Sequence, residues 1–116
     1  MSKKFPLSIV IITKNESENI EECLKSASWA DDVVVLDDLS TDATTKIAKM
    51  YTERVYERKM DIEGRHRNYA YSLAKNEWVF SLDADERITD ELREELKHLL
   101  RKEMKDTVFN VPIKAF

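Results

Sequence analysis

The feature that most constrains the fold is an alternation between short, nearly all-apolar segments and segments with helical periodicity. Leu7–Ile12 and Val33–Leu36 are rich in β-branched residues, and Ser8 is the only polar residue in either run. Strands buried on both faces of a parallel sheet have this composition. The segment between them, with Ser17 as a suitable N-cap, repeats apolar residues at the i, i+3, i+4, i+7 spacing of one helix face: Ile20, Cys23, Leu24 and Ala27.

The alternation continues along the chain. Further strands are expected at Arg54–Glu57 and Trp78–Leu82, and the fifth apolar run is Thr107–Ile113, interrupted at Pro112. One helix is expected from Thr41 or Asp42 to Met50, with Ala43, Ile47 and Met50 inward. A second is expected at Arg67–Lys75, with Tyr69, Ala70, Leu73 and Ala74 on one side. A third is expected at Asp90–Lys102, capped by Thr89, with Leu92, Leu96, Leu99 and Leu100 inward. Asp61–Arg65 is expected to be a polar loop. This order predicts an α/β three-layer sandwich with a mainly parallel sheet, in a single domain of residues 1–116.

Composition limits the classes of function. Hydrophobic residues make up 42% of the 116 residues and charged residues 36%, which excludes a disordered tail. A net charge of −4 argues against a nucleic-acid binder. It also weakens binding to anionic membranes, although a local basic patch could attach the chain to the inner face of a membrane. Because Cys23 is the only cysteine and no apolar run approaches about 20 residues, we expect a cytoplasmic protein without disulfides or zinc.

Three groups of polar residues follow predicted strands, at the edge where open α/β sheets bind ligands. They are Thr13–Glu16, Asp37–Asp38 and Asp83–Asp85. Two acidic groups on one edge repel each other unless a cation or a set of donors lies between them. Carboxylate oxygens suit Mg²⁺ or Mn²⁺, and a magnesium site typically combines one or two carboxylates with phosphate oxygens. The acids Asp83 and Asp85 are therefore the predicted metal ligands.

Three motifs in order resemble family 2 glycosyltransferases of the GT-A fold. They are LSIVIITKNESENI from Leu7, VVVLDDLSTDAT from Val33 and RNYAYSLAKNEWVFSLDADERIT from Arg67. The words TKNE, RNYA and SLDADE are most similar to the lipopolysaccharide-core β-glucosyltransferase type. The recognisable motifs span Leu7 to Thr89. The resemblance implies a metal-dependent enzyme of lipopolysaccharide biosynthesis that transfers a hexose from a nucleoside-diphosphate sugar, typically a UDP-sugar, to a saccharide or lipid-linked acceptor.

The resemblance also implies roles for single residues. The nucleotide base would be held by the first strand-end loop and the acids of the second strand: Thr13, Asn15, Glu16, Asp37 and Asp38. Arg67 would lie near the diphosphate. Asp83 would lie near the ribose or a metal-bound water, and Asp85 would bind Mg²⁺ or Mn²⁺. A carboxylate that accepts the N3–H of uracil would read a donor that cytosine lacks.

The sequence departs from the family pattern at Leu39 and, mildly, at Asn76, which stands where glycine is common but tolerates the left-handed conformation. Leu39 stands where family members often have glycine, so an altered turn is expected there, because leucine tolerates a positive φ poorly. The general base and the acceptor site of inverting members lie in a later part of the domain, so no catalytic residue is assigned, and Glu86 is not at the position of the base. The 116 residues are therefore interpreted as the donor-binding half of the domain. An exposed sheet edge would favour self-association into a homo-oligomer.

Other interpretations remain open for the same residues. The acids could cap helices, Thr13 and Asn15 could close a turn, and Arg67 could be a surface cation. The chain could be a non-catalytic module that binds nucleotide and metal without transferring a sugar. A phospho-receiver domain is similar in length, but it needs its acid pair after the first strand, where Thr13–Glu16 stand. The two histidines, His66 and His98, are far apart in sequence and are not expected to bind metal.

Overall fold

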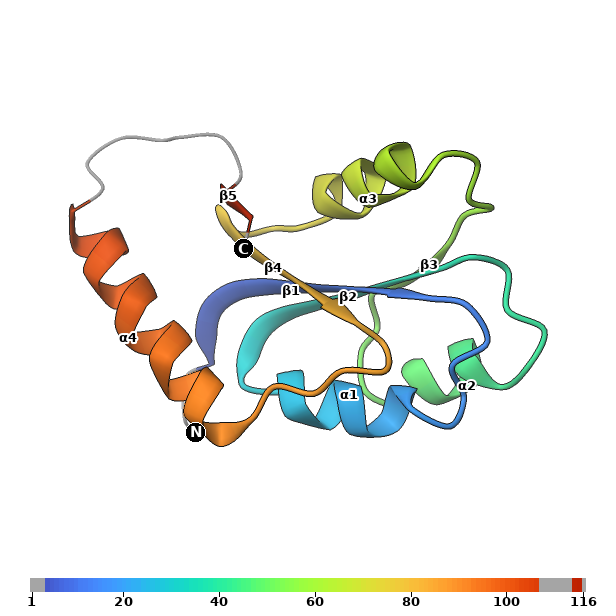
Figure 1. Cartoon of the computed structure of the whole chain (residues 1–116), viewed down its shortest axis with the longest axis horizontal. Helices are drawn as coiled ribbons and strands as arrows, with labels where there is room; N and C mark the ends of the chain where they lie inside the picture. Colours follow the sequence, from blue (N-terminus) through green and yellow to red (C-terminus); the bar gives the residue numbers. More distant parts are fainter. Residues whose placement is uncertain (1–3, 107–113, 116) are drawn as a thin grey trace.

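The computed structural model describes residues 4–106 and 114–115. Its five strands pair only in parallel and lie in the order β3-β2-β1-β4-β5 (Figure 1). They are β1 (Phe5–Thr13), β2 (Ala30–Asp37), β3 (Val55–Glu57), β4 (Trp78–Asp83) and β5 (Lys114–Ala115). The prediction of an α/β fold with a mainly parallel sheet is confirmed.

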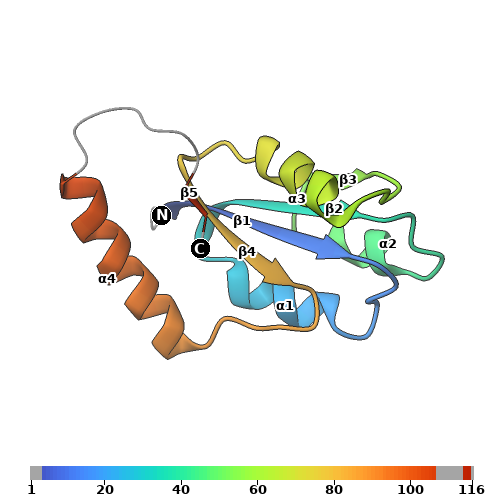
Figure 2. The same ribbon diagram turned by 45° about the horizontal axis from the view of Figure 1, so that its top comes forward.

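Helices cover both faces of this sheet and form the outer layers of the sandwich (Figures 1 and 2). On one face lie α1 (Ile20–Ala27) and α2 (Thr44–Ala48), and on the opposite face lies α3 (Glu63–Ser72). The longest helix, α4 (Asp90–Asp106), packs beside the beginning of β1. There the cationic ends of Arg101 and Lys97 lie over the rings of Phe5 and Trp29, at 5.6 and 5.7 Å from the ring centroids.

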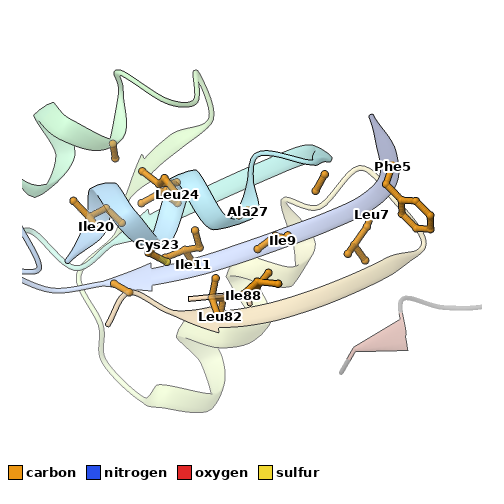
Figure 3. Close-up of a cluster of buried hydrophobic side chains, with 14 of the residues drawn as sticks. Phe5, Leu7, Ile9, Ile11, Ile20, Cys23, Leu24, Ala27, Leu82 and Ile88 are labelled. Atoms are coloured by element: carbon orange, nitrogen blue, oxygen red, sulfur yellow. The ribbon is translucent and has the colours of Figure 1, made fainter. Parts of the chain in front are cut away.

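The side chains of β1 explain why its sequence is almost continuously apolar. Leu7, Ile9 and Ile11 belong to the cluster beneath α1, which also includes Ile20, Cys23, Leu24 and Ala27 (Figure 3). Val10 points to the other face, into the cluster that α3 covers through Ala70. All of these β1 side chains are fully buried, and each contributes roughly 1.5–3 kcal/mol of transfer free energy.

Several predicted details of the helices are wrong. Helix α1 begins at Ile20 with Asn19 at the N-cap, so Ser17 does not cap it; the Ser17 N–H donates to Asp42 instead (3.2 Å). Helix α2 is shorter than predicted and ends at Ala48, which leaves Met50 74% exposed. Its buried positions are Thr44 and Ala48, and the predicted inward Ala43 is exposed.

For α3 and α4, some predicted details are confirmed and others are wrong. Helix α3 begins at Glu63, so Gly64 and Arg65 are helical rather than part of a loop. It ends at Ser72, and Tyr69, predicted to be inward, is 42% exposed. Thr89 caps α4 as predicted, since its Oγ1 accepts the N–H of Leu92 (3.1 Å). In the same helix Leu96 and Leu100 are buried, whereas Leu99 is 43% exposed.

Strand β2 begins three residues before the predicted Val33, which places Asp32 inside the sheet. Its buried carboxylate accepts hydrogen bonds from Ser8 Oγ (2.6 Å) and Lys75 N–H (2.9 Å), and it forms an ion pair with Arg54. These partners satisfy the charge, as a buried carboxylate requires.

The predicted apolar run Thr107–Ile113 lies outside the described residues. In the part of the chain that is described, no helix has the length and apolar character needed to cross a membrane.

Candidate functional site

The candidate site lies where the strand order of the sheet reverses. The chain runs from β1 to β2 and β3 on one side, and then returns to place β4 on the other side of β1. Ile12 pairs with Asp83 and Thr13 pairs with Asp37, so the three strands end at one level. A cleft of about 240 Å³ opens there between the end of β1 and the end of β4. Open α/β sheets bind ligands at such a reversal.

The two acids at the end of β2 have different environments. Asp37 is fully buried. Its Oδ1 accepts hydrogen bonds from the hydroxyls of Thr13 and Ser40 (both 2.6 Å), and its Oδ2 accepts the N–H of Ser40 (2.7 Å). Asp38 lines the cleft, and its Oδ1 accepts the N–H of Met60 (2.9 Å). Of the two acids, Asp38 is therefore the one placed to meet a ligand, while Asp37 ties β1 to the turn after β2.

The loop after β1 is held by that same turn. Asn15 has a φ of 50°, and its Oδ1 accepts the N–H of Thr41 (2.8 Å) while its N–H donates to Ser40 Oγ (2.7 Å). Asn15 is not among the residues that line the cleft, whereas Glu16 and Thr13 are. The backbone N–H of Glu16 donates to Thr44 Oγ1 (2.8 Å). Asn15 therefore closes and positions the loop that brings its neighbours to the cleft.

The turn after β2 has a positive φ at Leu39, although the sequence predicted that leucine would alter this turn. Leu39 has a φ of 46°, in the left-handed region where glycine is favoured, so the prediction of an altered turn is wrong. The Leu39 side chain is 45% exposed and avoids a clash with the core. The hydrogen bonds from Ser40 to Asp37 follow immediately and hold the turn in place. They offset the cost of roughly 1–2 kcal/mol of a left-handed leucine.

The acids at the end of β4 are exposed and face the cleft. Asp83 and Asp85 both line it, on either side of the buried Ala84. The backbone of this turn is fixed, because Asp83 N–H donates to Glu86 Oε1 (3.1 Å) and Cys23 Sγ donates to the carbonyl oxygen of Asp83 (3.6 Å). Burial raises the pKa of Cys23 to about 12, so its thiol stays protonated and remains a donor.

The donor set at β4 fits a divalent cation that shares its coordination with a ligand. Among the side chains that the structure describes, those of residues 4–103, no three histidine, cysteine or acidic groups gather closely enough to hold a metal ion alone. Asp83 and Asp85 supply two exposed carboxylates in the cleft. Mg²⁺ sites that bind nucleotides typically use one or two carboxylates and take other oxygens from phosphates and water. The two acids could supply that share of a metal site, and their role as metal ligands remains a prediction.

Arg67 lies beside the cleft and is engaged with the protein. Its Nη1 donates to Ser81 Oγ on β4 (2.7 Å), and its Nη2 lies 3.5 Å from Glu63 Oε1. Arg67 is not among the residues that line the cleft. The structure therefore places Arg67, which was predicted to lie near the diphosphate, next to the cleft, but its guanidinium points towards β4 and Glu63.

Three lining residues, Ile12, Met60 and His66, were not anticipated as part of the site. His66, on α3, is 1% exposed and lines the cleft together with Asp38 and Met60. Its Nδ1 lies 3.2 Å from Arg58 Nη1. The misplaced start of α3 concealed it, because a residue in a solvated loop would not be expected to face inward. Its position four residues before the buried Ala70, on the same face of the helix, is the signal that could have found it.

Comparison with known proteins decides the family. The model of glycosyl transferase family 2 matches residues 8–115. The chain belongs to glycosyl transferase family 2. A similar protein of Rickettsia bellii, described as an uncharacterized glycosyltransferase, is 33% identical over 109 residues. That match covers 93% of this chain and 37% of the relative.

A second relative carries a more specific description. The lipopolysaccharide core biosynthesis glycosyltransferase LpsC of Rhizobium meliloti is 33% identical over 106 residues, which are 86% of this chain and 39% of LpsC. The chain thus spans somewhat more than a third of the length of these curated relatives. The resemblance to family 2 glycosyltransferases is confirmed, and similar proteins include a lipopolysaccharide-core enzyme.

Solved structures of another protein share the fold. The structure of Staphylococcus aureus TarS 1–349 in complex with UDP matches with a TM-score of 0.73 at 28% identity, over 86% of this chain and 33% of that one. The complex of the same protein with UDP-GlcNAc matches with a TM-score of 0.66. These likenesses confirm the GT-A fold.

Within this family 2 domain, the structure brings five of the predicted residues to one cleft and leaves three outside it. Those that line the cleft are Thr13, Glu16, Asp38, Asp83 and Asp85. Asp37 is buried behind it, and Asn15 and Arg67 flank it. The ligand roles of all eight remain predictions.

Proposed function

We propose that this family 2 domain is the donor-binding part of a metal-dependent glycosyltransferase that uses a UDP-sugar. The observation that carries the proposal is the position of the cleft. It lies at the strand reversal of the sheet, with a carboxylate at the end of β2 and two more at the end of β4. The related TarS structures in complex with UDP and UDP-GlcNAc support a uridine nucleotide as the ligand.

In this proposal the two acidic strand ends divide the ligand between them. Asp38, beside Met60 and Ile12, lies in the part of the cleft that takes the uracil base, where its carboxylate accepts the N3–H. Apolar contacts from the side chains of Met60 and Ile12 suit the faces of a base. The Thr13 hydroxyl donates to Asp37, so Thr13 shapes this end of the cleft rather than acting as a free donor.

The diphosphate then extends towards the end of β4. Asp83 and Asp85 would hold Mg²⁺ or Mn²⁺ there, and the metal would neutralise the charge that develops on the diphosphate as the sugar bond breaks. The side chain of Lys14, which donates to the carbonyl oxygen of Asp38 (2.8 Å), adds a positive charge at the cleft. Arg67 would reach a phosphate only by exchanging its hydrogen bond with Ser81 for one to the ligand.

The remaining parts of the activity are proposed from the relatives. A hexose would pass to a saccharide or lipid-linked acceptor, and the likeness to LpsC supports a role in lipopolysaccharide biosynthesis. The acceptor site and the general base of such an enzyme have no counterpart among the residues assigned here. A cytoplasmic location, peripheral membrane association and self-association also remain predictions.

Calorimetric titration tests the donor site. UDP and UDP-GlcNAc would be titrated into the protein with Mn²⁺ and with excess chelator. We expect the affinity for UDP to fall at least tenfold when the metal is removed or when Asp85→Asn deletes a metal ligand. Asp90→Asn is the matched control, because it removes the same charge from an exposed acid in the first turn of α4.

Two outcomes would count against the proposal. The first is no binding of any uridine nucleotide with metal present, and the second is equal binding by Asp85→Asn and Asp90→Asn. A transfer assay with UDP-sugars and saccharide acceptors would then separate an active enzyme from a module that binds the nucleotide without transferring the sugar.

A further inference from the structure

His66 lines the cleft, and one nitrogen of its buried imidazole is unsatisfied. His66 is 1% exposed, and its Nε2 has no hydrogen-bond partner within the described part of the chain. Buried polar atoms in folded proteins are nearly always hydrogen-bonded, because leaving one unpaired lowers the free energy of unfolding. A group of this kind at a binding cleft points to a partner that arrives with the ligand.

The contact with Arg58 determines which nitrogen carries the proton. Arg58 Nη1 lies 3.2 Å from His66 Nδ1, and a guanidinium can only donate. The Nδ1 atom must therefore accept, and the proton of the neutral ring must be on Nε2. Arg58 is held in this position by Asp61 (3.4 Å) and by the ring of Tyr69, whose centroid lies 5.5 Å from the guanidinium carbon.

The ring is also kept neutral. Burial and the neighbouring charge of Arg58 lower the pKa of His66 below its usual value of 6.5, and they outweigh the opposite effect of Asp38 and Asp61. Near neutral pH the Nε2–H is thus an uncharged donor on a residue that lines the same cleft as the carboxylate of Asp38.

We propose that the Nε2–H of His66 donates to a carbonyl oxygen of the uracil ring and makes His66 a specificity-determining residue of the donor site. Uracil presents an N3–H donor flanked by two carbonyl acceptors. An acceptor on Asp38 and a donor on His66 in the same cleft are complementary to that edge. This inference rests on the proposed function, since it assigns a contact to a ligand in the same cleft.

Arg58 acts through His66 as a positioning residue. Its backbone N–H donates to the carbonyl oxygen of Asp37 (2.9 Å), which fixes the segment after β3 to the end of β2. Its side chain then sets the tautomer and orientation of the imidazole. Loss of this guanidinium would allow the proton to move to Nδ1 and turn Nε2 into an acceptor, which would face a carbonyl oxygen unfavourably.

The test compares two replacements of His66 by titration with UDP in the presence of Mn²⁺. Leucine removes the donor, and we expect His66→Leu to weaken UDP binding about fivefold to tenfold, as expected for one lost hydrogen bond at a buried site. Glutamine places an amide N–H near the position of Nε2, so His66→Gln should bind within about twofold of the wild type. His98→Leu removes the exposed imidazole of α4 and is the matched control.

Titration with uridine, followed by NMR, locates the contact on the base. The same fold-loss for uridine as for UDP in His66→Leu supports the proposal, and a loss confined to UDP overturns it by assigning the contact to the diphosphate. In the unliganded wild type at pH 7.5, the ¹⁵N shifts of His66 should show a protonated Nε2 and an unprotonated Nδ1. The opposite tautomer would also overturn the inference, even if no variant of His66 folds.

The two proposals fail in different ways. If the wild type binds UDP and His66→Leu binds equally well, the role of His66 is wrong and the donor site stands. If the wild type binds neither UDP nor uridine, the proposed function fails, and the inference about His66 fails with it.

Discussion

At the end of β2 the carboxylate of Asp37 is buried and accepts three hydrogen bonds, whereas at the end of β4 the carboxylates of Asp83 and Asp85 are exposed to the cleft. Both strands run into two acids within three residues. In the first pair, one acid holds the protein together and its neighbour, Asp38, is left for a ligand. In the second pair, both side chains face the space where a ligand would lie.

The difference shows that an acidic strand end has two distinct uses in this sheet. A buried carboxylate that accepts several hydrogen bonds from the protein stabilises the fold and is not accessible to a metal or a nucleotide. A carboxylate without such donors repels its neighbours and is stabilised only by an incoming cation or donor. Substitution of Asp37 should therefore mainly lower stability, whereas substitution of Asp83 or Asp85 should mainly weaken ligand binding.

The largest effect on stability is expected for Asp37. Asp37→Ala leaves two hydroxyls and a backbone N–H of Thr13 and Ser40 without their buried acceptor, so we expect the free energy of unfolding to fall by about 3 kcal/mol. Asp83→Ala should change it by less than about 0.5 kcal/mol, because surface substitutions rarely cost more. Urea unfolding of both variants checks this contrast, and equal losses would show that the two ends are not built differently.

Substitutions at the two residues with positive φ, Asn15 and Leu39, test how the turn at the end of β2 is stabilised. Leu39→Gly relieves a left-handed leucine in the turn that carries Ser40, and we expect a gain of about 0.5–1 kcal/mol after the added entropy of the unfolded chain is subtracted. Asn15→Gly should instead cost about 1 kcal/mol, because it removes the acceptor of the Thr41 N–H. Thermal unfolding measures both. A destabilised Leu39→Gly variant would mean that the turn is not strained.

The smallest expected effect is a dependence of the free energy of unfolding on pH that arises from His66. The pKa of His66 is lowered in the folded protein, so below about pH 6.5 the unfolded chain binds a proton that the folded chain does not. Stability is therefore present above about pH 6.5 and is lost as the pH falls towards the folded pKa. The stability of His66→Gln should decline less than that of the wild type between pH 7 and pH 5.5. Parallel declines in unfolding free energy would contradict a depressed pKa.

The sequence alone predicts the architecture well, because the strands buried on both faces and the helical periodicities are local patterns. It also identifies the strand ends as the site, since the rule for parallel sheets depends only on topology. It could not distinguish Asp37 from Asp38, because the choice depends on hydrogen bonds to Thr13 and Ser40. It missed His66 for a related reason: the burial of this side chain depends on where α3 begins. Leu39 shows that a residue of low propensity can be held at positive φ by its neighbours.

The central claim is that a metal–nucleotide complex binds between the end of β1 and the end of β4. Paramagnetic broadening of backbone NMR signals by substoichiometric Mn²⁺, with UDP present, locates the metal directly. We predict that broadening will be strongest at Asp83–Asp85 and will extend to Thr13 and Lys14, while Ser28 and Asn76, near the opposite edge of the sheet, will be unaffected. Broadening centred on another part of the protein, or none when UDP is bound, would contradict the account.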